Sequence, residues 1–167
     1  MSVSRVVQIN ISAGGVPKLP TAAVRVTREG LVGDGHRDAE HHGGPERAVC
    51  LYALEAIDAL QREGHPIRPG SLGENLTVQG LDWRAITPGT TLRIGQEVIL
   101  RVTRYTSPCA NIRLAFAGGD YARVSQKHHP GWSRVYASVL REGTVRQDDA
   151  VLVLSAGEAA ALRPGGR

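Results

Sequence analysis

The sequence reveals its fold class most clearly in residues 91–105, which read TLRIGQEVILRVTRY. At a period of two, Val98, Leu100 and Val102 share one face of the run 97–105, while Arg101 and Thr103 lie on the other, a pattern typical of a strand with one buried face. The pair Gly95-Gln96 separates this run from a shorter apolar run before it. Because a glycine-containing pair between two such runs indicates a tight β-hairpin, we predict two antiparallel strands joined by that turn.

Similar short, β-branched runs recur along the chain, with turn-forming residues between them. The 167 residues include 20 glycines and 9 prolines. Eight short strands spaced by turn signals favour a barrel or a sandwich over a doubly wound sheet. The last two runs are expected to flank a longer turn around Gly143. The predicted strands cover residues 3–11, 22–27, 47–52, 75–78, 91–94, 97–105, 134–141 and 150–154.

Helical patterns are scarcer than strand patterns. In residues 51–63, LYALEAIDALQRE, Leu54 and Ile57 fall at helical spacing, and Gly64 supplies a stop. The fold class predicted is therefore mainly β with a few helices (α+β). Shorter helices are expected over residues 111–117, over 120–128 with Asp120 as the cap, and at the start of the tail, 155–167.

Length and composition exclude several classes of protein. A chain of 167 residues without repeats or linkers fits a single domain, residues 1–167, with a core over about 3–154 and a tail over 155–167. Two cysteines, Cys50 and Cys109, exclude a disulfide scaffold. No apolar run approaches the roughly 18 residues that a membrane span needs, and the N-terminus lacks a signal-peptide core. We predict a soluble cytoplasmic protein with no membrane partner.

The basic charge does not indicate a nucleic-acid polymer as partner. The net charge is +4, but its 18 arginines and 2 lysines are scattered among 16 acidic residues, and aromatic residues make up only 4% of the chain. Base-stacking platforms need more aromatic side chains than this. An excess of arginine suits the recognition of a phosphate or carboxylate on a small ligand, although a solvated surface accounts for most of these residues.

The most unusual stretch is a long polar loop between two predicted strands, residues 30–47, which reads GLVGDGHRDAEHHGGPER. Backbone N–H groups of a glycine pair such as Gly43-Gly44 form nests that bind anions, and Arg47 offers a guanidinium fork to the same anion. The loop contains neither a Walker A motif nor a dinucleotide fingerprint, which excludes a nucleotide-binding P-loop.

The histidines of this loop leave three interpretations open. The spacing of His36, His41 and His42 matches no standard zinc motif, but with Asp34 or Asp38 these residues could converge on a metal ion. Alternatively, a histidine orients or protonates a bound ligand, because imidazole titrates near neutral pH. The third interpretation is structural, with the rings bonded to the backbone of the loop.

Two further segments carry candidate functional residues. Cys109 follows the strand 97–105, and a helix is expected to begin just after it; the dipole at a helix N-terminus favours a thiolate, so Cys109 is a candidate nucleophile or soft metal ligand. The alternative, a small buried hydrophobic residue, fits Cys50 better. Glu74 and Asn75 lie at the start of a predicted strand, where they either meet a ligand or cap a turn.

In their order and spacing these segments resemble the MOSC domain, the molybdenum-cofactor sulfurase C-terminal family, over about residues 3–154. The similarity looks closest to the small stand-alone bacterial members. The segments that carry the resemblance are GLVGDGH (30–36), HGGPERAV (42–49), PGSLGENL (69–76), LRIG (92–95), Pro108-Cys109 and Gly131-Trp132.

The resemblance implies a closed or partly closed β-barrel that binds molybdenum cofactor (Mo-molybdopterin), with Cys109 as the sulfur ligand of molybdenum. A thiolate suits that role because it is a soft donor. The pterin carries a terminal phosphate, which makes Arg47 and the backbone of Gly43-Gly44 candidates for binding it. Further candidates for cofactor binding are Gly33, Asp34, His41, Glu74, Asn75 and Asn111.

Family members are associated with the reduction of N-hydroxylated bases and amines, which implies a small N-oxygenated substrate. The candidate catalytic residues are then Cys109, His36 and His42, with His36 or His42 supplying a proton. Because the chain has no flavin, iron–sulfur or nicotinamide signature, a separate electron-donating reductase is the expected partner. Pyridoxal phosphate is not expected, since Lys18 and Lys127, the only lysines, lie in no motif that favours a Schiff base.

Two alternatives to an enzyme remain open from the sequence. In the first, the protein is a carrier, and Cys109 holds a persulfide or presents the cofactor for delivery without turnover. In the second, the protein is a metal- or anion-binding module built on His36, His41 and His42, and Cys109 is incidental.

Overall fold

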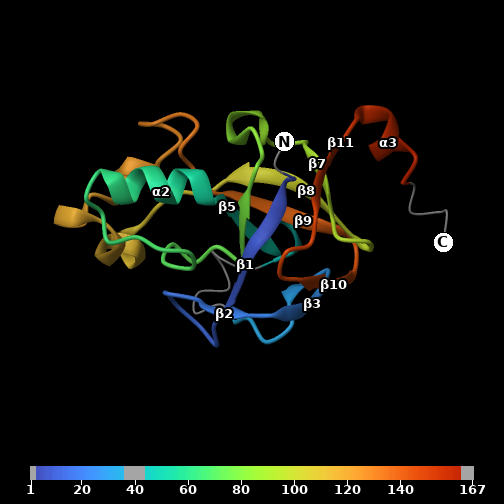
Figure 1. Ribbon diagram of the computed structural model, residues 1–167, viewed down its shortest axis with the longest axis horizontal. Coiled ribbons are helices and arrows are strands. Elements are labelled where there is room, and N and C mark those ends of the chain that lie inside the picture. Colours follow the sequence, from blue (N-terminus) through green and yellow to red (C-terminus); the bar gives the residue numbers. More distant parts are fainter. Residues whose placement is uncertain (1–2, 36–43, 163–167) are drawn as a thin grey trace.

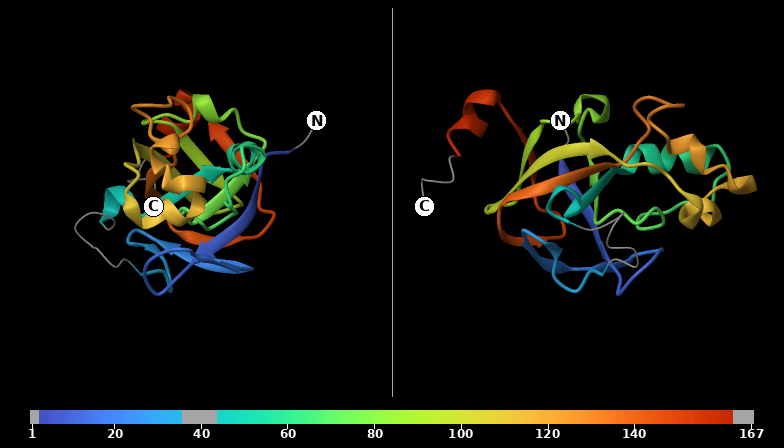
Figure 2. Two further views of the ribbon diagram at one scale, coloured as in Figure 1. Left: turned by 90° about the vertical axis from the view of Figure 1, so that its left-hand side faces the viewer. Right: turned by 180° about the vertical axis from the view of Figure 1, so that it is seen from behind.

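The computed structural model describes residues 3–35 and 44–162 of the chain (Figure 1). Its centre is a curved sheet, with α2 (Leu54–Arg62) at one end of the long axis and α3 (Ala156–Ala160) at the other (Figures 1 and 2). Within these residues, the large sheet has eight strands, in the spatial order β11 (Val151–Leu154), β7 (Thr91–Ile94), β8 (Val98–Tyr105), β9 (Val135–Arg141), β5 (Val49–Ala53), β6 (Leu76–Gln79), β1 (Arg5–Ile11) and β2 (Leu19–Thr21). The smaller sheet has the order β10 (Gly143–Arg146), β3 (Ala23–Thr27) and β4 (Gly30–Leu31).

The large sheet curls so that β1 meets the residues just before β11. Arg5 forms an isolated antiparallel bridge with Ala150, and the Val151 N–H donates to the Ser4 carbonyl at 2.9 Å. No continuous ladder closes the sheet in the described part of the chain, so it is partly closed. The predicted mainly β fold with a few helices, built on a closed or partly closed sheet, is confirmed.

Strands β7 and β8 form the predicted hairpin. Ile94 pairs with Val98, which leaves a turn of residues 95–97. Gly95 has a φ of +62°, and a Cβ atom there would lie 2.6 Å from the Asp149 carboxylate. Both the backbone conformation and the close approach therefore favour glycine at the position that marked the turn in the sequence.

The central strand β5 is buried along its whole length because both of its faces are covered. Val49 and Leu51 belong to the core inside the curved sheet, whereas Tyr52 joins a second core with Ile57 and Leu60 of α2 on the outer face. Strand β5 runs parallel to β6, and α2 lies in the crossover between them. The outer face of β5 therefore packs against the helical end of the molecule.

Helix α2 ends as predicted but begins later. Gly64 has a φ of +100°, the His65 N–H donates to the Leu60 carbonyl and the Gly64 N–H donates to the Gln61 carbonyl, which is a Schellman motif. The helix begins at Leu54, since the first three residues of the predicted helix belong to β5. A buried apolar run does not distinguish strand from helix by its periodicity.

The predicted longer turn around Gly143, between the last two predicted strands, is wrong. Strand β9 is followed by β10, which pairs with β3, whereas β11 pairs with β7. Gly143 begins β10 instead of centring a turn, and it pairs with Val26 of β3. A Cβ atom there would lie 2.5 Å from the Glu97 Cβ, so close packing favours glycine at this position. Strands β2, β4 and β10 were not predicted, and each is four residues or shorter. Strands β2 and β4 pair with strands that neighbour them in the sequence, whereas β10 pairs with β3, which only the tertiary fold brings near.

Several predicted helices are 3-10 helices, and the described chain has no membrane-spanning candidate. Asp120 precedes one of them, but its side chain makes no capping hydrogen bond. The predicted tail helix, α3, is present with a capping box between Ser155 and Glu158. None of the described helices is long and apolar enough to cross a membrane. The 3-10 helices are η1 (Pro45–Arg47), η2 (Trp83–Ala85), η3 (Ala110–Ala115), η4 (Ala117–Gly119) and η5 (Tyr121–Val124).

Candidate functional site

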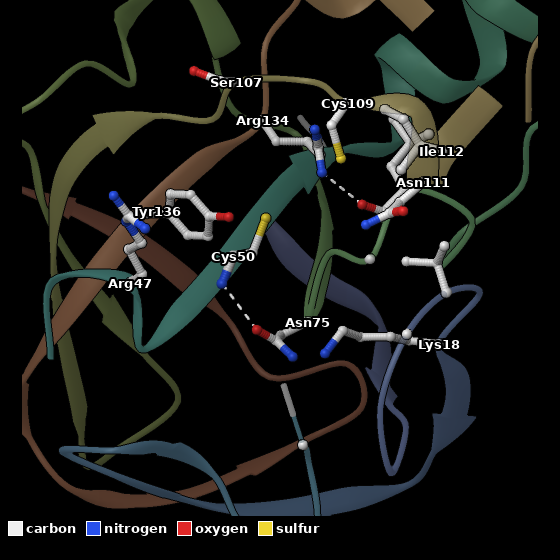
Figure 3. Close-up of a pocket in the computed structure, with 15 residues that line it drawn as sticks. Lys18, Arg47, Cys50, Asn75, Ser107, Cys109, Asn111, Ile112, Arg134 and Tyr136 are labelled. Carbon is white, nitrogen blue, oxygen red and sulfur yellow. Dashed lines mark hydrogen bonds between the residues drawn. The ribbon is translucent and has the colours of Figure 1, made fainter. Parts of the chain in front are cut away.

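A cavity of about 270 Å³ opens on the outer face of the sheet, between β5, the start of β9 and the turn that follows β8 (Figure 3). One side, here called the strand wall, is formed by Cys50, Asn75 and Tyr136. The opposite side, here called the turn wall, is formed by Ser107, Cys109 and Asn111. Three cationic side chains, those of Lys18, Arg47 and Arg134, also line the cavity.

The strand wall is held by pairing between neighbouring strands. Cys50 of β5 lies directly opposite Tyr136 of β9. The Cys50 N–H donates to the Asn75 side-chain oxygen at 2.9 Å, and the Asn75 N–H donates to the Cys50 carbonyl at 2.7 Å. The Asn75 amide nitrogen donates in turn to Asp34 at 2.9 Å. These contacts make the wall part of the sheet and fix its side chains.

Burial strongly disfavours the anionic forms of the strand-wall thiol and phenol. Burial raises the pKa of Cys50 to about 12, and the positive charge of Arg134 only partly opposes this effect. Burial likewise raises the pKa of Tyr136 to about 12. Both groups are therefore protonated at neutral pH.

The turn wall has a different origin. Pro108 carries the chain out of β8, and Cys109 sits in extended conformation immediately before the 3-10 helix η3, in place of the predicted longer helix. Its thiol is half-buried and free, and both cysteine sulfur atoms point into the cavity (Figure 3). Asn111 and Ser107 beside it are exposed. The turn wall thus offers an accessible thiol with hydroxyl and amide groups around it.

Lys18 forms a buried ion pair at the edge of the cavity. Its ammonium group lies 2.6 and 2.7 Å from the two Asp34 carboxylate oxygens, and the two side chains are only 8% and 3% exposed. Asp34 also accepts from the Ser12 N–H at 3.0 Å and from Asn75. The loop that carries Lys18 is thereby fastened to the strand wall.

The other two cations of the cavity are arginines. The Arg47 guanidinium lies 6.0 Å from the centroid of the Tyr136 ring. Arg134 is buried, and its Nη1 donates to the Leu72 carbonyl at 2.6 Å, while its Nε has no hydrogen-bond partner. A buried donor without a partner is costly and points to a group that completes it.

The cavity brings together four of the predicted site residues. Arg47, Asn75, Cys109 and Asn111 line it, and Asp34 joins them through Lys18 and Asn75. His36, His41, His42 and Gly43 lie outside the described residues.

Three predicted site residues are not among those that line the cavity. Glu74 is fully buried; it accepts from the Gly70 N–H and the Thr77 hydroxyl, and burial raises its pKa. Glu74 therefore holds the turn before β6. Gly33 and Gly44 are exposed, and both have positive φ angles, so they shape the backbone of their loops.

Sequence reasoning missed most of the lining residues, among them four with a titratable side chain. Lys18, Cys50, Arg134 and Tyr136 were not proposed as site residues, although all four line the cavity. A signal was present for two of them, because a strand over residues 134–141 places Arg134 and Tyr136 on the same face. Lys18 gave no such signal, since its partner Asp34 lies 16 residues away in another loop.

Comparison with known proteins places the chain in a family. The sequence model of the MOSC domain matches residues 38–152. The chain is 34% identical over 146 residues to the uncharacterized protein YflK of Bacillus subtilis (strain 168), a match that covers 86% of this chain and 65% of YflK. It is 33% identical over 128 residues to protein YiiM of Escherichia coli (strain K12), covering 74% of this chain and 55% of YiiM. The protein therefore belongs to the MOSC domain family, and it spans just under two thirds of the first relative and about half of the second.

Solved structures agree with this assignment. The crystal structure of YiiM from Escherichia coli matches with a TM-score of 0.69 and 25% identity, covering 92% of this chain and 71% of that one. YiiM from Geobacillus stearothermophilus has the same fold, with a TM-score of 0.69 at 24% identity over 94% of this chain and 78% of that one. MOSC domains are linked in general to the binding of molybdenum cofactor.

Proposed function

We propose that the protein binds molybdenum cofactor in the cavity between the strand wall and the turn wall, with Cys109 as the sulfur ligand of molybdenum. The observation that carries the proposal is the half-buried, free thiol of Cys109, which faces a cavity lined by three cationic side chains. A soft thiolate donor suits a high-valent metal, and the cations suit an anionic cofactor.

The donor set of the cavity fits the cofactor. Arg47 lines the cavity and would face the terminal phosphate, which a guanidinium binds through two parallel hydrogen bonds. The side-chain amides of Asn75 and Asn111 supply donors and acceptors for the pterin ring. The unpartnered Nε of Arg134 is a further donor inside the cavity. Each polar part of the cofactor thus has a matching group.

The reaction we propose is the reduction of an N-hydroxylated base or amine. The N–O bond breaks, and one hydroxylamine group with two electrons and two protons gives one amine and one water. Bound molybdenum cofactor supplies the two-electron chemistry of this step. The protein holds the cofactor through Cys109 and excludes water from the buried strand wall. His36 or His42, which lie outside the described residues, would deliver a proton to the leaving oxygen.

The electrons are proposed to come from a separate reductase, because the sequence carries no redox motif of its own. A chemical reductant replaces that partner in an assay. Protein from a host replete in molybdenum cofactor, supplied with reduced methyl viologen, is expected to convert an N-hydroxylated purine to the amine. Cys109→Ala should abolish the turnover, whereas Cys50→Ala, which removes the other thiol of the same cavity, should retain most of it.

The assay also separates the two alternatives. A protein that contains molybdenum or a persulfide on Cys109 but shows no turnover would be a carrier. A protein that retains zinc in both wild type and Cys109→Ala, and loses it when His36, His41 and His42 are replaced, would be a metal-binding module. Turnover that survives Cys109→Ala would contradict the proposed ligand.

A further inference from the structure

The cavity contains two buried cations whose surroundings differ. Lys18 is 8% exposed and is neutralised by both oxygens of Asp34. Arg134 is 7% exposed, and no carboxylate of the described residues forms an ion pair with it; its Nη1 donates to the neutral carbonyl of Leu72. A buried charge is normally paired, so the isolated charge of Arg134 needs an explanation.

The neighbours of Arg134 do not supply the missing negative charge. Its charge favours the anionic forms of Cys50, Tyr136 and Glu74, but burial raises the pKa of each of these groups and outweighs it. Glu74 is moreover turned to Gly70 and Thr77 through its hydrogen bonds. The positive charge of Arg134 is therefore available to an anionic ligand in the cavity.

The unpartnered Nε of Arg134 indicates which chemical group the ligand carries. Nη1 is occupied by Leu72, whereas Nε is buried and unpartnered, and the guanidinium extends into the cavity (Figure 3). The edge of a guanidinium formed by Nε and Nη2 binds two oxygen atoms of one oxyanion side by side. Ser107 and Asn111 of the turn wall add neutral donors on the other side of the cavity.

We infer that Arg134 anchors a tetrahedral oxyanion of the molybdate or sulfate class, bound inside the cavity between the two cysteines. The inference rests on the cavity of the proposed function and deepens it, because the guanidinium recognises the oxyanion whether or not it belongs to a larger cofactor. Arg47, the other arginine of the cavity, belongs to η1 and lies beside the ring of Tyr136.

The test measures oxyanion binding to the purified full chain, without any assay of turnover. Molybdate, sulfate and phosphate are titrated separately by calorimetry, and each is added to thermal melts. We expect binding by the wild type with a rise in Tm, and a ranking of the three oxyanions that shows which source the site prefers. Arg134→Gln should weaken the binding by about tenfold or more and remove the rise in Tm. Arg134→Lys should retain part of both, because it keeps the charge but not the fork.

Arg113→Gln is the matched control, since it removes an exposed arginine of η3 that does not line the cavity. It should bind the oxyanion within about threefold of the wild type. The inference is overturned if none of the three oxyanions binds the wild type at millimolar concentration, if Arg134→Gln binds as tightly as the wild type, or if Arg113→Gln loses binding as completely as Arg134→Gln. Because cofactor and turnover are not measured, a failure of this inference is distinguishable from a failure of the proposed function.

Discussion

The two walls of the cavity place the same chemical groups in opposite settings. Each wall presents one cysteine and one asparagine. Cys50 and Asn75 are buried, in β5 and directly before β6, whereas Cys109 is half-buried in the turn after β8 and Asn111 is exposed in η3. In the strand wall, the side-chain amide of Asn75 forms hydrogen bonds within the protein, to the Cys50 N–H and to Asp34. The turn wall leaves its groups available. The comparison indicates that the strand wall supports the fold and that the turn wall meets the ligand.

The largest expected difference is in the reactivity of the two thiols. Burial raises the pKa of Cys50 to about 12, so its thiolate form is rare at pH 8. Because Cys109 is half-buried and Cys50 is buried, Cys109 should be alkylated by iodoacetamide at least about a hundred times faster than Cys50 in the folded protein. Peptide mass spectrometry at timed intervals measures both rates. Equal rates would remove the distinction between the walls.

The matched asparagines should differ in their effect on stability. Asn75→Ala leaves the Cys50 N–H and one side of Asp34 without partners in a buried site, which should lower the free energy of unfolding by about 3 kcal/mol. Asn111→Ala changes an exposed side chain and should cost less than about 0.5 kcal/mol. Urea denaturation of the two variants measures both values, and similar losses would contradict the assignment of roles.

The strand wall should also make the protein sensitive to alkaline pH. The folded state holds the protons of Cys50 and Tyr136 up to about pH 12, whereas the unfolded groups titrate near 9.0 and 10.0. The stability that these groups contribute is complete below pH 9 and is lost as the pH rises toward 12, with a slope of up to about 1.4 kcal/mol per pH unit for each group.

Denaturation at pH 8, 9, 10 and 11 measures this slope. Cys50→Ala should remove the part of the slope that begins near pH 9, because it deletes the titrating thiol, and Cys109→Ala is the control. A slope that Cys50→Ala leaves unchanged would show that the buried thiol does not stay protonated.

The smallest expected effect separates the two cysteines at neutral pH. Cys50→Ala removes a buried sulfur atom from the strand wall and should lower the free energy of unfolding by about 1 kcal/mol. Cys109→Ala should change it by less than about 0.5 kcal/mol, because the thiol is half-buried and packs in no core. Thermal and urea melts provide the comparison, and a larger loss for Cys109→Ala would assign it a structural role.

Local features of the sequence were sufficient for the parts of the fold that depend on neighbouring residues. The hairpin of β7 and β8 and the end of α2 at Gly64 each need only a few consecutive residues. Strand β10 was missed because its partner β3 lies more than 100 residues earlier, and nothing in its own four residues marks it as a strand. Pairing across the chain therefore had to come from the structure.

The same limit applies to the site. Cys109 was found because its turn, Pro108 and the following helical residues are adjacent in the sequence. Arg134 and Lys18 were missed because their roles depend on what surrounds them: Asp34 neutralises Lys18, and no described carboxylate neutralises Arg134. Burial and charge pairing depend on the tertiary structure, so the sequence alone does not distinguish an arginine that has an unpartnered donor from other arginines.

The most direct test of the account is the molybdenum content per chain. Protein produced in a host replete in molybdenum cofactor is analysed for molybdenum as wild type, Cys109→Ala and Cys50→Ala, all purified in the same way. The account predicts close to one molybdenum per chain in the wild type, loss of most of it in Cys109→Ala, and retention in Cys50→Ala. Equal molybdenum in Cys109→Ala and wild type, or a loss confined to Cys50→Ala, would contradict the assignment of the ligand to the turn wall.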